Sequence, residues 1–235
     1  MVSGTVDNTA PANRLTPDAA HLPATLRITE IFYSLQGETS RSGLPTVFIR
    51  LTGCPLRCGY CDTGYAFSGG SNHTFDQIFT AVKQHCTRYV TVTGGEPLAQ
   101  KQCIALLREL CDRDYSVSLE TSGAIDVSAV DARVSKILDL KTPASGEVEK
   151  NLWANLARLT PHDEIKFVIC NEADYEWAKQ QLVARNLPAL CPVLFSPSYR
   201  DLPAAQLAEW ILRDRLPVRF QTQLHKQLWG EKPGV

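Results

Sequence analysis

Residues 54–64 read C-P-L-R-C-G-Y-C-D-T-G, and this stretch decides the fold. Cys54, Cys58 and Cys61 place three thiols within one short loop at the spacing C-x3-C-x2-C. A tetrahedral structural zinc takes four protein ligands, and a four-iron cluster has four corners to fill. Three cysteines are one too few for either, so the pattern predicts a metal centre whose last position is left for a bound ligand.

Two other uses of these cysteines are considered. A zinc knuckle could be completed by His73, His85 or Cys86, but the usual second pair of closely spaced ligands is missing from the sequence. A disulfide framework is disfavoured, because a chain of 235 residues does not need one and three clustered thiols cannot pair evenly.

The cysteine spacing, with Tyr60 just before the third cysteine, resembles the signature of the radical S-adenosylmethionine (radical SAM) superfamily. The resemblance implies that each cysteine holds one iron of a [4Fe-4S] cluster. It also implies that the amino and carboxylate groups of S-adenosylmethionine (SAM) occupy the fourth iron.

Length and charge narrow the class of partner. A chain of 235 residues can bury one substantial core, which favours a single domain. The formal net charge of -1 provides no basic field for a nucleic-acid backbone, so the partner is expected to be a small molecule and not a nucleic acid.

The ends of the chain and its hydropathy predict a cytoplasmic protein. No apolar run reaches the length of a membrane span, and residues 1–23 contain no apolar signal-peptide core. That stretch is rich in Ala, Pro, Thr, Asn and Asp, which predicts a disordered extension followed by one domain over residues 24–235. Outside the cluster motif, five single cysteines in apolar patterns are expected to pack in the core as thiols: Cys86, Cys103, Cys111, Cys170 and Cys191.

Past residue 26, apolar runs of strand length alternate with amphipathic stretches of helix length. The predicted strands cover residues 27–33, 46–52, 88–93, 116–121, 136–140, 164–169, 190–195 and 218–221. The predicted helices cover residues 75–82, with Thr74 as N-cap, and 99–112, 149–158, 174–185 and 204–215. Strands joined by helices pair in parallel through right-handed crossovers, so the expected fold is α/β, a curved parallel sheet or partial, incomplete βα barrel.

Ligands of such folds bind at the carboxyl ends of the strands. Most predicted strands here end in charged, hydroxyl or amide residues: Arg50, Thr93 to Glu96, Glu120 to Ser122, Asp139 to Thr142, Lys166, Ser196 and Gln221. Such a residue at one strand end is usually a solvated turn. The same chemistry at most of the strand ends predicts a site encircled by loops.

The turn Thr93-Gly94-Gly95-Glu96-Pro97 follows an apolar strand, and its glycines let the backbone approach a ligand closely. Alone it could be an ordinary tight turn. Behind the cysteine loop it resembles the second radical SAM motif, whose backbone carbonyls and glutamate receive the SAM ammonium group. Asp62 and Thr63, directly after the last cysteine, carry the hard oxygen atoms that suit Mg²⁺.

A third set of residues predicts the ligand. Gln36 and Glu38 follow the first strand, Arg50 ends the second, and Glu120 ends a central one. Singly, each has the plain interpretation of a turn or surface residue. Together the amide and carboxylates could bind a guanine-like edge, while Arg50 clamps a carboxylate bidentately. The implied ligand is a carboxylated heterocycle.

Nine strings in order, FYSLQGE, FIRLTGC, CDT, TGGEP, LETSG, DLKTP, IKFVI, FSP and QLHK, resemble the 7-carboxy-7-deazaguanine synthase family of radical SAM enzymes. The resemblance implies ring contraction of 6-carboxy-5,6,7,8-tetrahydropterin to 7-carboxy-7-deazaguanine with loss of ammonia, in queuosine and 7-deazapurine biosynthesis. SAM would act catalytically, with Mg²⁺ as a helper ion and flavodoxin or ferredoxin as electron donor. The family also implies a homodimer. It often carries Gly where this chain has Thr39.

The resemblance assigns roles by position. Cys54, Cys58 and Cys61 would bind the cluster, and Thr63 would bind Mg²⁺. The residues implied for the pterin are Leu35, Gln36, Gly37, Glu38, Arg50, Thr93, His225 and Val235. Those implied for SAM are Gly95, Glu96, Glu120, Ser122, Lys141, Thr142 and Pro143. Two alternatives stay open: a radical SAM activase that makes a glycyl radical on a partner protein, and a zinc-stabilised binding module without turnover.

Overall fold

The strands and helices of the computed structural model follow the alternation expected from the sequence. The structure describes residue 1, residues 24–232 and residue 234, so the predicted disordered extension and Val235 lie outside the described residues, apart from Met1. The strands are β1 (Thr25–Leu35), β2 (Pro45–Leu51), β3 (Ser71–Thr74), β4 (Tyr89–Gly94), β5 (Ser116–Thr121), β6 (Ser135–Leu140), β7 (Glu164–Ile169), β8 (Val193–Pro197) and β9 (Arg219–Phe220).

The helices lie between and after these strands. The α-helices are α1 (Phe75–Lys83), α2 (Cys103–Asp112), α3 (Glu172–Ala184), α4 (Ala204–Asp214) and α5 (Leu224–Trp229). Short 3-10 helices are η1 (Gly64–Phe67), η2 (Pro97–Ala99), η3 (Pro143–Ser145), η4 (Val148–Lys150), η5 (Trp153–Arg158) and η6 (Leu187–Ala189). No helix in the described part of the chain is both long enough and apolar enough to span a membrane.

The strands form one nine-stranded sheet in the order β3-β1-β2-β4-β5-β6-β7-β8-β9. From β2 to β9 every neighbouring pair is parallel, as expected. The expected parallel sheet carries an antiparallel edge, where β1 pairs antiparallel with both β2 and β3. The connection from β1 to β2 is a short turn, which can join antiparallel strands but is too short for a parallel crossover.

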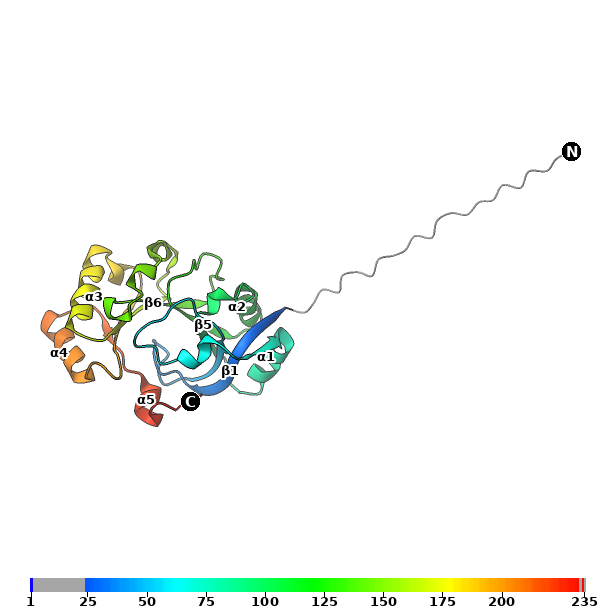
Figure 1. The fold of residues 1–235 in the computed structure, drawn as a ribbon, viewed down its shortest axis with the longest axis horizontal. Coiled ribbons are helices and arrows are strands. Elements are labelled where there is room, and N and C mark those ends of the chain that lie inside the picture. The colour runs from blue at the N-terminus through cyan, green and yellow to red at the C-terminus, as the bar shows by residue number, and fades with distance from the viewer. Residues whose placement is uncertain (2–23, 233, 235) are drawn as a thin grey trace.

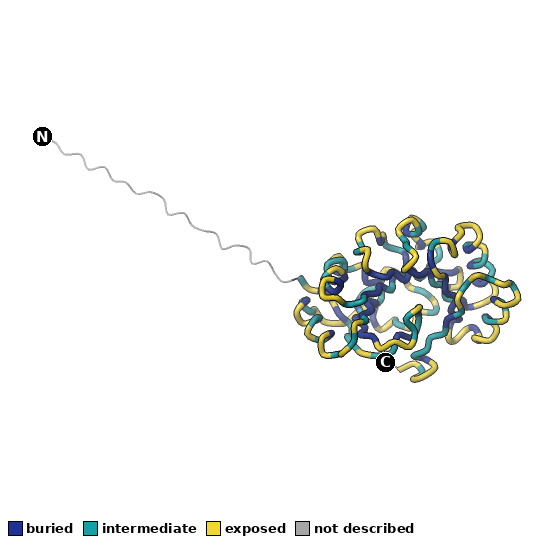
Figure 2. Tube along the Cα trace, turned by 180° about the vertical axis from the view of Figure 1, so that it is seen from behind, coloured by how far each residue is buried: buried dark blue, intermediate teal, exposed yellow. Residues whose placement is uncertain are grey.

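The sheet curves into an open, partial barrel with α1 to α4 on its outer side (Figure 1). Buried residues run along the wall of this barrel, and exposed residues lie mainly on the outer helices and loops (Figure 2). All five residues of β8 are buried, as a parallel strand covered on both faces requires. Because these strands run parallel, their carboxyl ends lie together at one mouth of the barrel.

The first helix illustrates how local sequence fixes an outer element. Phe75, Ile78 and Val82 are buried on the face of α1 that packs against the sheet. Thr74 is the N-cap, as predicted: its hydroxyl accepts from the Gln77 amide, and the Gln77 side chain accepts from the Thr74 amide. This reciprocal pair satisfies two backbone donors that the helix itself cannot use.

Other boundaries differ from the prediction. The expected helix over residues 149–158 is replaced by η4 and η5. The break falls at Asn151, whose side chain bonds both the amide and the carbonyl of Lys141 at 2.8 Å and holds its own backbone extended. The helix expected from residue 99 begins only at Cys103, because η2 precedes it.

Five short elements were not predicted: β3, α5, η1, η3 and η6. The predicted location of one cysteine is also wrong. Cys103, Cys111, Cys170 and Cys191 are buried as expected, whereas Cys86 is exposed. Cys86 follows the last turn of α1, where the chain has already left the core face.

Candidate functional site

The cysteine loop leaves the carboxyl end of β2 and packs against the turn that follows β4. Gly53 has φ +100°, a left-handed conformation that favours glycine, and its carbonyl accepts from the Glu96 amide at 2.8 Å. A Cβ on Gly95 would lie 2.3 Å from the Gly53 carbonyl oxygen and 2.7 Å from the Cys54 Cβ. Glycine at position 95 is therefore what allows the two loops to touch.

Cys54, Cys58 and Cys61 line one cavity of about 670 Å³ at the mouth of the barrel, called the central cavity below. Burial raises the pKa of the Cys54 thiol, and it raises the pKa of Cys58 to about 11. These thiols therefore stay protonated near neutral pH until a metal replaces the proton. Among the described residues, no three His, Cys, Asp or Glu side chains are arranged so that they could hold a single metal ion. Three cysteines spaced along one loop beside a cavity fit a cluster of several irons better than one ion.

Glu96 is fully occupied by internal donors. Its carboxylate accepts from the Leu98 amide at 3.0 Å, from the Ser122 amide at 2.7 Å, and from the Ser122 and Thr121 hydroxyls at 2.5 and 3.0 Å. The side chain is completely buried and is not among the residues that line the central cavity. Glu96 thus ties the turn after β4 to the end of β5, and we refer to these four residues as the Glu96 hub.

Gln36 connects the two carboxylates predicted to bind the ligand. Its side-chain nitrogen donates to Glu120 and to Thr91, both at 3.2 Å, and its side-chain oxygen accepts from the Glu38 amide at 3.0 Å. Thr93 donates to the other oxygen of Glu120 at 2.9 Å. Because the amide of Gln36 is used internally and only 2% exposed, it positions Glu38 and Glu120 more than it offers free hydrogen bonds.

Glu38 and Glu120 differ in their electrostatic surroundings. Burial by itself raises the pKa of Glu38, but the Lys166 ammonium bonded to it reverses the effect and holds that pKa below its ordinary value. Glu120 has only neutral hydrogen-bond donors, so burial, together with the nearby charge of Glu38, raises its pKa. Gln223 is the residue just before α5, and its side chain donates a hydrogen bond to Glu38 at 2.8 Å.

Arg50 faces the central cavity from the end of β2. Its Nε lies 2.7 Å from Glu30 Oε1, and the Tyr65 hydroxyl donates to the same oxygen at 2.8 Å. The guanidinium also lies over the rings of Phe32 and Tyr65. These contacts use one edge of the guanidinium and fix its plane, which suits bidentate binding of a carboxylate on the other edge.

The C-terminal helix is tied to the cysteine loop. Lys226 Nζ lies 2.6 Å from Asp62 Oδ2, and Gln223 donates to the same carboxylate at 3.1 Å. Burial by itself raises the pKa of Asp62, but Lys226 outweighs it and lowers that pKa well below the usual range. The Thr63 hydroxyl donates to Asp62 at 2.8 Å. These bonds hold α5 at the wall of the central cavity, which Gln223, His225 and Lys226 line.

Three more residues complete the wall of the central cavity. Lys141 lies 3.2 Å from Asp139 and over the ring of Tyr60. The Tyr60 hydroxyl is buried without a hydrogen-bond partner among the described residues, whereas the Asp139 Oδ1 atom is the one that Lys141 approaches. A buried polar atom without a partner is unusual in native proteins, and the Tyr60 hydroxyl could bond a polar ligand.

His225 of α5 packs on the turn after β1, where a Cβ on Gly37 would lie 2.3 Å from its Nδ1. Thr39, in the same turn, is buried with φ +95°, a region where glycine costs least and a branched residue is strained. A glycine at this position would have the backbone freedom that this turn requires.

Most of the residues assigned from the sequence meet in the central cavity. They are Leu35, Gln36, Gly37, Glu38, Arg50, Cys54, Cys58, Cys61, Thr63, Thr93, Gly95, Glu120, Ser122, Lys141 and His225. Glu96, Thr142 and Pro143 are not among its lining residues, and Thr142 donates to the Val168 carbonyl at 3.0 Å. Lys166, Gln223 and Lys226 received no individual role from the sequence. Lys166 was expected at a strand end, but it is the third residue of β7 and lies within the strand.

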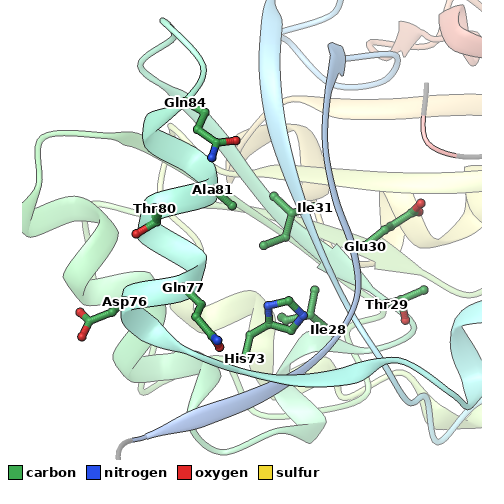
Figure 3. Close-up of a pocket in the computed structure, with 10 residues that line it drawn as sticks. All are labelled: Ile28, Thr29, Glu30, Ile31, His73, Asp76, Gln77, Thr80, Ala81 and Gln84. Carbon is green, nitrogen blue, oxygen red and sulfur yellow. The ribbon is translucent and has the colours of Figure 1, made fainter.

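A second hollow lies on the outer side of the barrel between β1 and α1, with a volume of about 610 Å³. Figure 3 shows Ile31 of β1 facing Ala81 of α1, while the side chain of Glu30 points away from the helix. None of the predicted site residues lines this hollow. The chemistry of the chain is therefore concentrated in the central cavity.

Comparison with known proteins defines the class. Residues 48–180 match the family model of the radical SAM superfamily, and the chain belongs to that superfamily. Membership implies a [4Fe-4S] cluster and SAM, which the three cysteines facing the central cavity fit. The chain also resembles the crystal structure of QueE from Escherichia coli, with a TM-score of 0.70 at 22% identity over 86% of this chain and 95% of that one. This likeness shows the partial-barrel fold.

Sequence relatives identify the family within the class. The chain is 48% identical over 210 residues to the 7-carboxy-7-deazaguanine synthase of Chlorobaculum tepidum, which covers 88% of this chain and 96% of the relative. It is 42% identical over 226 residues to the enzyme of the same name from Koribacter versatilis, covering 89% and 100%. The chain belongs to the 7-carboxy-7-deazaguanine synthase family.

Proposed function

We propose that this chain converts 6-carboxy-5,6,7,8-tetrahydropterin to 7-carboxy-7-deazaguanine with loss of ammonia, as a radical SAM enzyme of queuosine and 7-deazapurine biosynthesis. The observation that carries the proposal is that the three cysteines share one cavity with the carboxylates and the guanidinium expected to bind a carboxylated pterin. The named relatives support the synthase over the glycyl-radical activase and over the zinc-stabilised module.

The cluster and SAM, when bound, supply the one-electron chemistry, and the chain supplies placement. Cys54, Cys58 and Cys61 would hold the cluster. The pterin would lie against Glu38, Glu120 and the free edge of Arg50, with Leu35, Gln36, Gly37, Thr93, His225 and Val235 completing its site. Gly95, Glu96, Glu120, Ser122, Lys141, Thr142 and Pro143 would contact or support SAM.

The polar groups of the cavity match the proposed substrate. Two carboxylates and an amide-bearing turn face one side, as a heterocycle with an amino-pyrimidinone edge requires. Arg50 faces the same space and is suited to the substrate carboxylate. The segment around α5 contributes Gln223, His225 and Lys226 to the cavity wall, and exclusion of water there would protect reactive species.

Further features are part of the same proposal. Mg²⁺ would be bound beside Thr63, because hydroxyl and carboxylate oxygens gather there. Flavodoxin or ferredoxin would deliver the electron to a homodimer whose protomers each form one domain over residues 24–235. Eight free thiols are typical of a reducing compartment, which supports a cytoplasmic location.

The test is turnover by the full chain after anaerobic reconstitution with iron and sulfide. Reduced protein is mixed with SAM, Mg²⁺ and 6-carboxy-5,6,7,8-tetrahydropterin, and mass spectrometry follows product lacking one ammonia. Cys58→Ala is the negative variant and Cys86→Ala the matched control, since Cys86 is exposed and does not line the central cavity.

We expect brown protein with acid-labile sulfide, product from the wild type and Cys86→Ala, and none from Cys58→Ala. Turnover by Cys58→Ala without its cluster would remove the cluster from the mechanism. Colourless protein that retains zinc would overturn the proposal in favour of the binding module.

A further inference from the structure

Lys166 occupies a place in the barrel that no assigned role explains. It lies within β7, directly beside Asp139 of β6 in the register of the parallel pair. Its side chain is 12% exposed and lines the central cavity. Its ammonium forms an ion pair with Glu38 and lies 3.7 Å from Asp139 Oδ2. A buried lysine at such a place needs carboxylate partners, and it also acts on them.

Glu38 retains acceptor capacity that only a ligand can use. Lys166 bonds one of its oxygens, and Gln223 donates to the other at 2.8 Å. An ionised carboxylate can accept about four hydrogen bonds, so about two positions remain. The side chain is 14% exposed, and this opening is into the central cavity. Glu38 can therefore receive N–H donors from a bound heterocycle while its own position stays fixed.

The charge on Glu38 depends on Lys166. Burial without a neighbouring cation disfavours the charged form of a carboxylate. Glu120 shows the effect in the same cavity: Gln36 and Thr93 are its hydrogen-bond donors, neither is charged, and its pKa is raised. The difference between the two glutamates follows the position of the lysine.

We propose that Lys166 is the positioning residue of the substrate pocket, holding Glu38 in place as an ionised acceptor that selects a ligand edge carrying N–H donors. The inference deepens the proposed function and rests on it for the identity of the ligand. Lys166 acts through Glu38, which lies 128 residues away along the chain.

The groups around Glu38 come from three elements: Lys166 from β7, Glu120 from β5, and His225 with the uncharged Gln223 from the segment at α5. Asp139 of β6 lies 3.7 Å from the same lysine. Burial lowers the pKa of His225, so it is mostly neutral near pH 7 and does not replace Lys166. Replacing Lys166 therefore leaves Glu38 facing carboxylates and neutral groups.

The experiment compares Lys166→Met with Lys166→Arg in the full chain carrying its cluster. Lys179→Met is the matched control, because Lys179 also pairs with two carboxylates, Glu176 and Asp214, but does not line the central cavity. Calorimetry gives the Kd of 6-carboxy-5,6,7,8-tetrahydropterin and of SAM at several pH values. Thermal unfolding and cluster absorbance report whether each variant folds and loads.

We expect Lys166→Met to weaken pterin binding about tenfold near neutral pH, the value of one charge-assisted hydrogen bond. Binding should tighten as pH rises, since Glu38 must then lose its proton, and SAM binding should change less than twofold. Lys166→Arg should restore most of the affinity. Equal losses for pterin and SAM, or a loss independent of pH, would reduce Lys166 to a packing residue and overturn the inference.

A second measurement does not depend on the ligand. Infrared difference spectra between each protein and its Glu38→Gln counterpart isolate the Glu38 carboxyl band during a pH titration. We expect Glu38 to be ionised across the neutral range in the wild type and to titrate at higher pH in Lys166→Met. Identical titrations would overturn the inference. If the wild type fails to bind the pterin, the proposed function fails, and these spectra still decide the role of Lys166.

Discussion

The Glu96 hub and the pocket around Glu38 lie at the same mouth of the barrel and both centre on a shielded glutamate, yet they differ in how many acceptor positions are left. Glu96 accepts from two backbone amides and two hydroxyls and is completely buried. Glu38 has one donor on each oxygen and lines the central cavity. A carboxylate whose acceptor positions are all filled holds loops together, whereas one with free acceptor positions remains available to a ligand.

The comparison gives the two glutamates opposite expected phenotypes. Loss of Glu96 leaves several buried donors without partners, so its cost falls on folding. The residues around Glu38 affect the fit of one ligand, so their cost falls on binding. The following substitutions test this division, from the largest expected effect to the smallest.

Glu96→Ala should lower the free energy of unfolding by about 3 kcal/mol, because the Leu98 amide and the Ser122 donors lose their acceptor. Both SAM and pterin binding should be lost with the loop geometry. Denaturant unfolding measures the first effect and calorimetry the second. Glu109→Ala is the control, since its ion pair with Arg113 is exposed and should contribute under about 1 kcal/mol. A stable Glu96→Ala protein that has lost SAM alone would make Glu96 a ligand residue.

Gln36→Ala should lower both the stability of the fold and the affinity for the pterin. Its amide supports Glu120, Thr91 and the backbone of Glu38, so we expect a loss of about 2 kcal/mol in unfolding free energy. Pterin affinity should fall as well, while SAM affinity should hold. If unfolding is unchanged and only pterin affinity falls, Gln36 is a direct ligand and not a support.

Arg50→Lys keeps the charge and removes the planar fork, so pterin affinity should fall about tenfold, or about 1.4 kcal/mol. SAM affinity and the unfolding midpoint should stay close to wild type, because Arg50 faces the substrate side of the central cavity. Parallel titrations of both ligands provide the measurement. Equal losses for the two would place Arg50 elsewhere in the mechanism.

Thr74→Ala should lower the unfolding free energy by about 1 kcal/mol through loss of the capping hydroxyl of α1. Neither ligand should bind more weakly, because Thr74 lies outside the central cavity. Denaturant unfolding with calorimetry on the same samples gives both values. A change in pterin affinity would mean that α1 and the central cavity are coupled.

Prediction from the sequence succeeded where the signal is local. The cysteine spacing, the two glycines after β4 and the N-cap of α1 each lie within a few residues of the structure they produce. The eight strands that periodicity predicted are present, and the boundaries of β5 and β7 match. It failed where a distant partner overrides the local pattern, as at Asn151, whose bonds to Lys141 stop the expected helix.

The site shows the same limit. Glu96 and Glu38 both read as ligand residues in the sequence, since each stands in a polar turn after a strand. Their difference depends on which donors other strands bring to them: Thr121 and Ser122 from the end of β5, and Lys166 from β7. Those partners are set by strand register and barrel curvature, which a local pattern does not encode.

The sequence by itself therefore determined the class of chemistry, because metal-ligand spacing and glycine turns are properties of a short stretch of chain. Only the tertiary structure decided which carboxylate is saturated and which stays open, where Lys166 stands, and that α5 lies on the cysteine loop through Lys226 and Asp62. Hydrogen bonds and ion pairs act over a few ångströms in space, and folding alone brings groups from distant parts of the chain within that range.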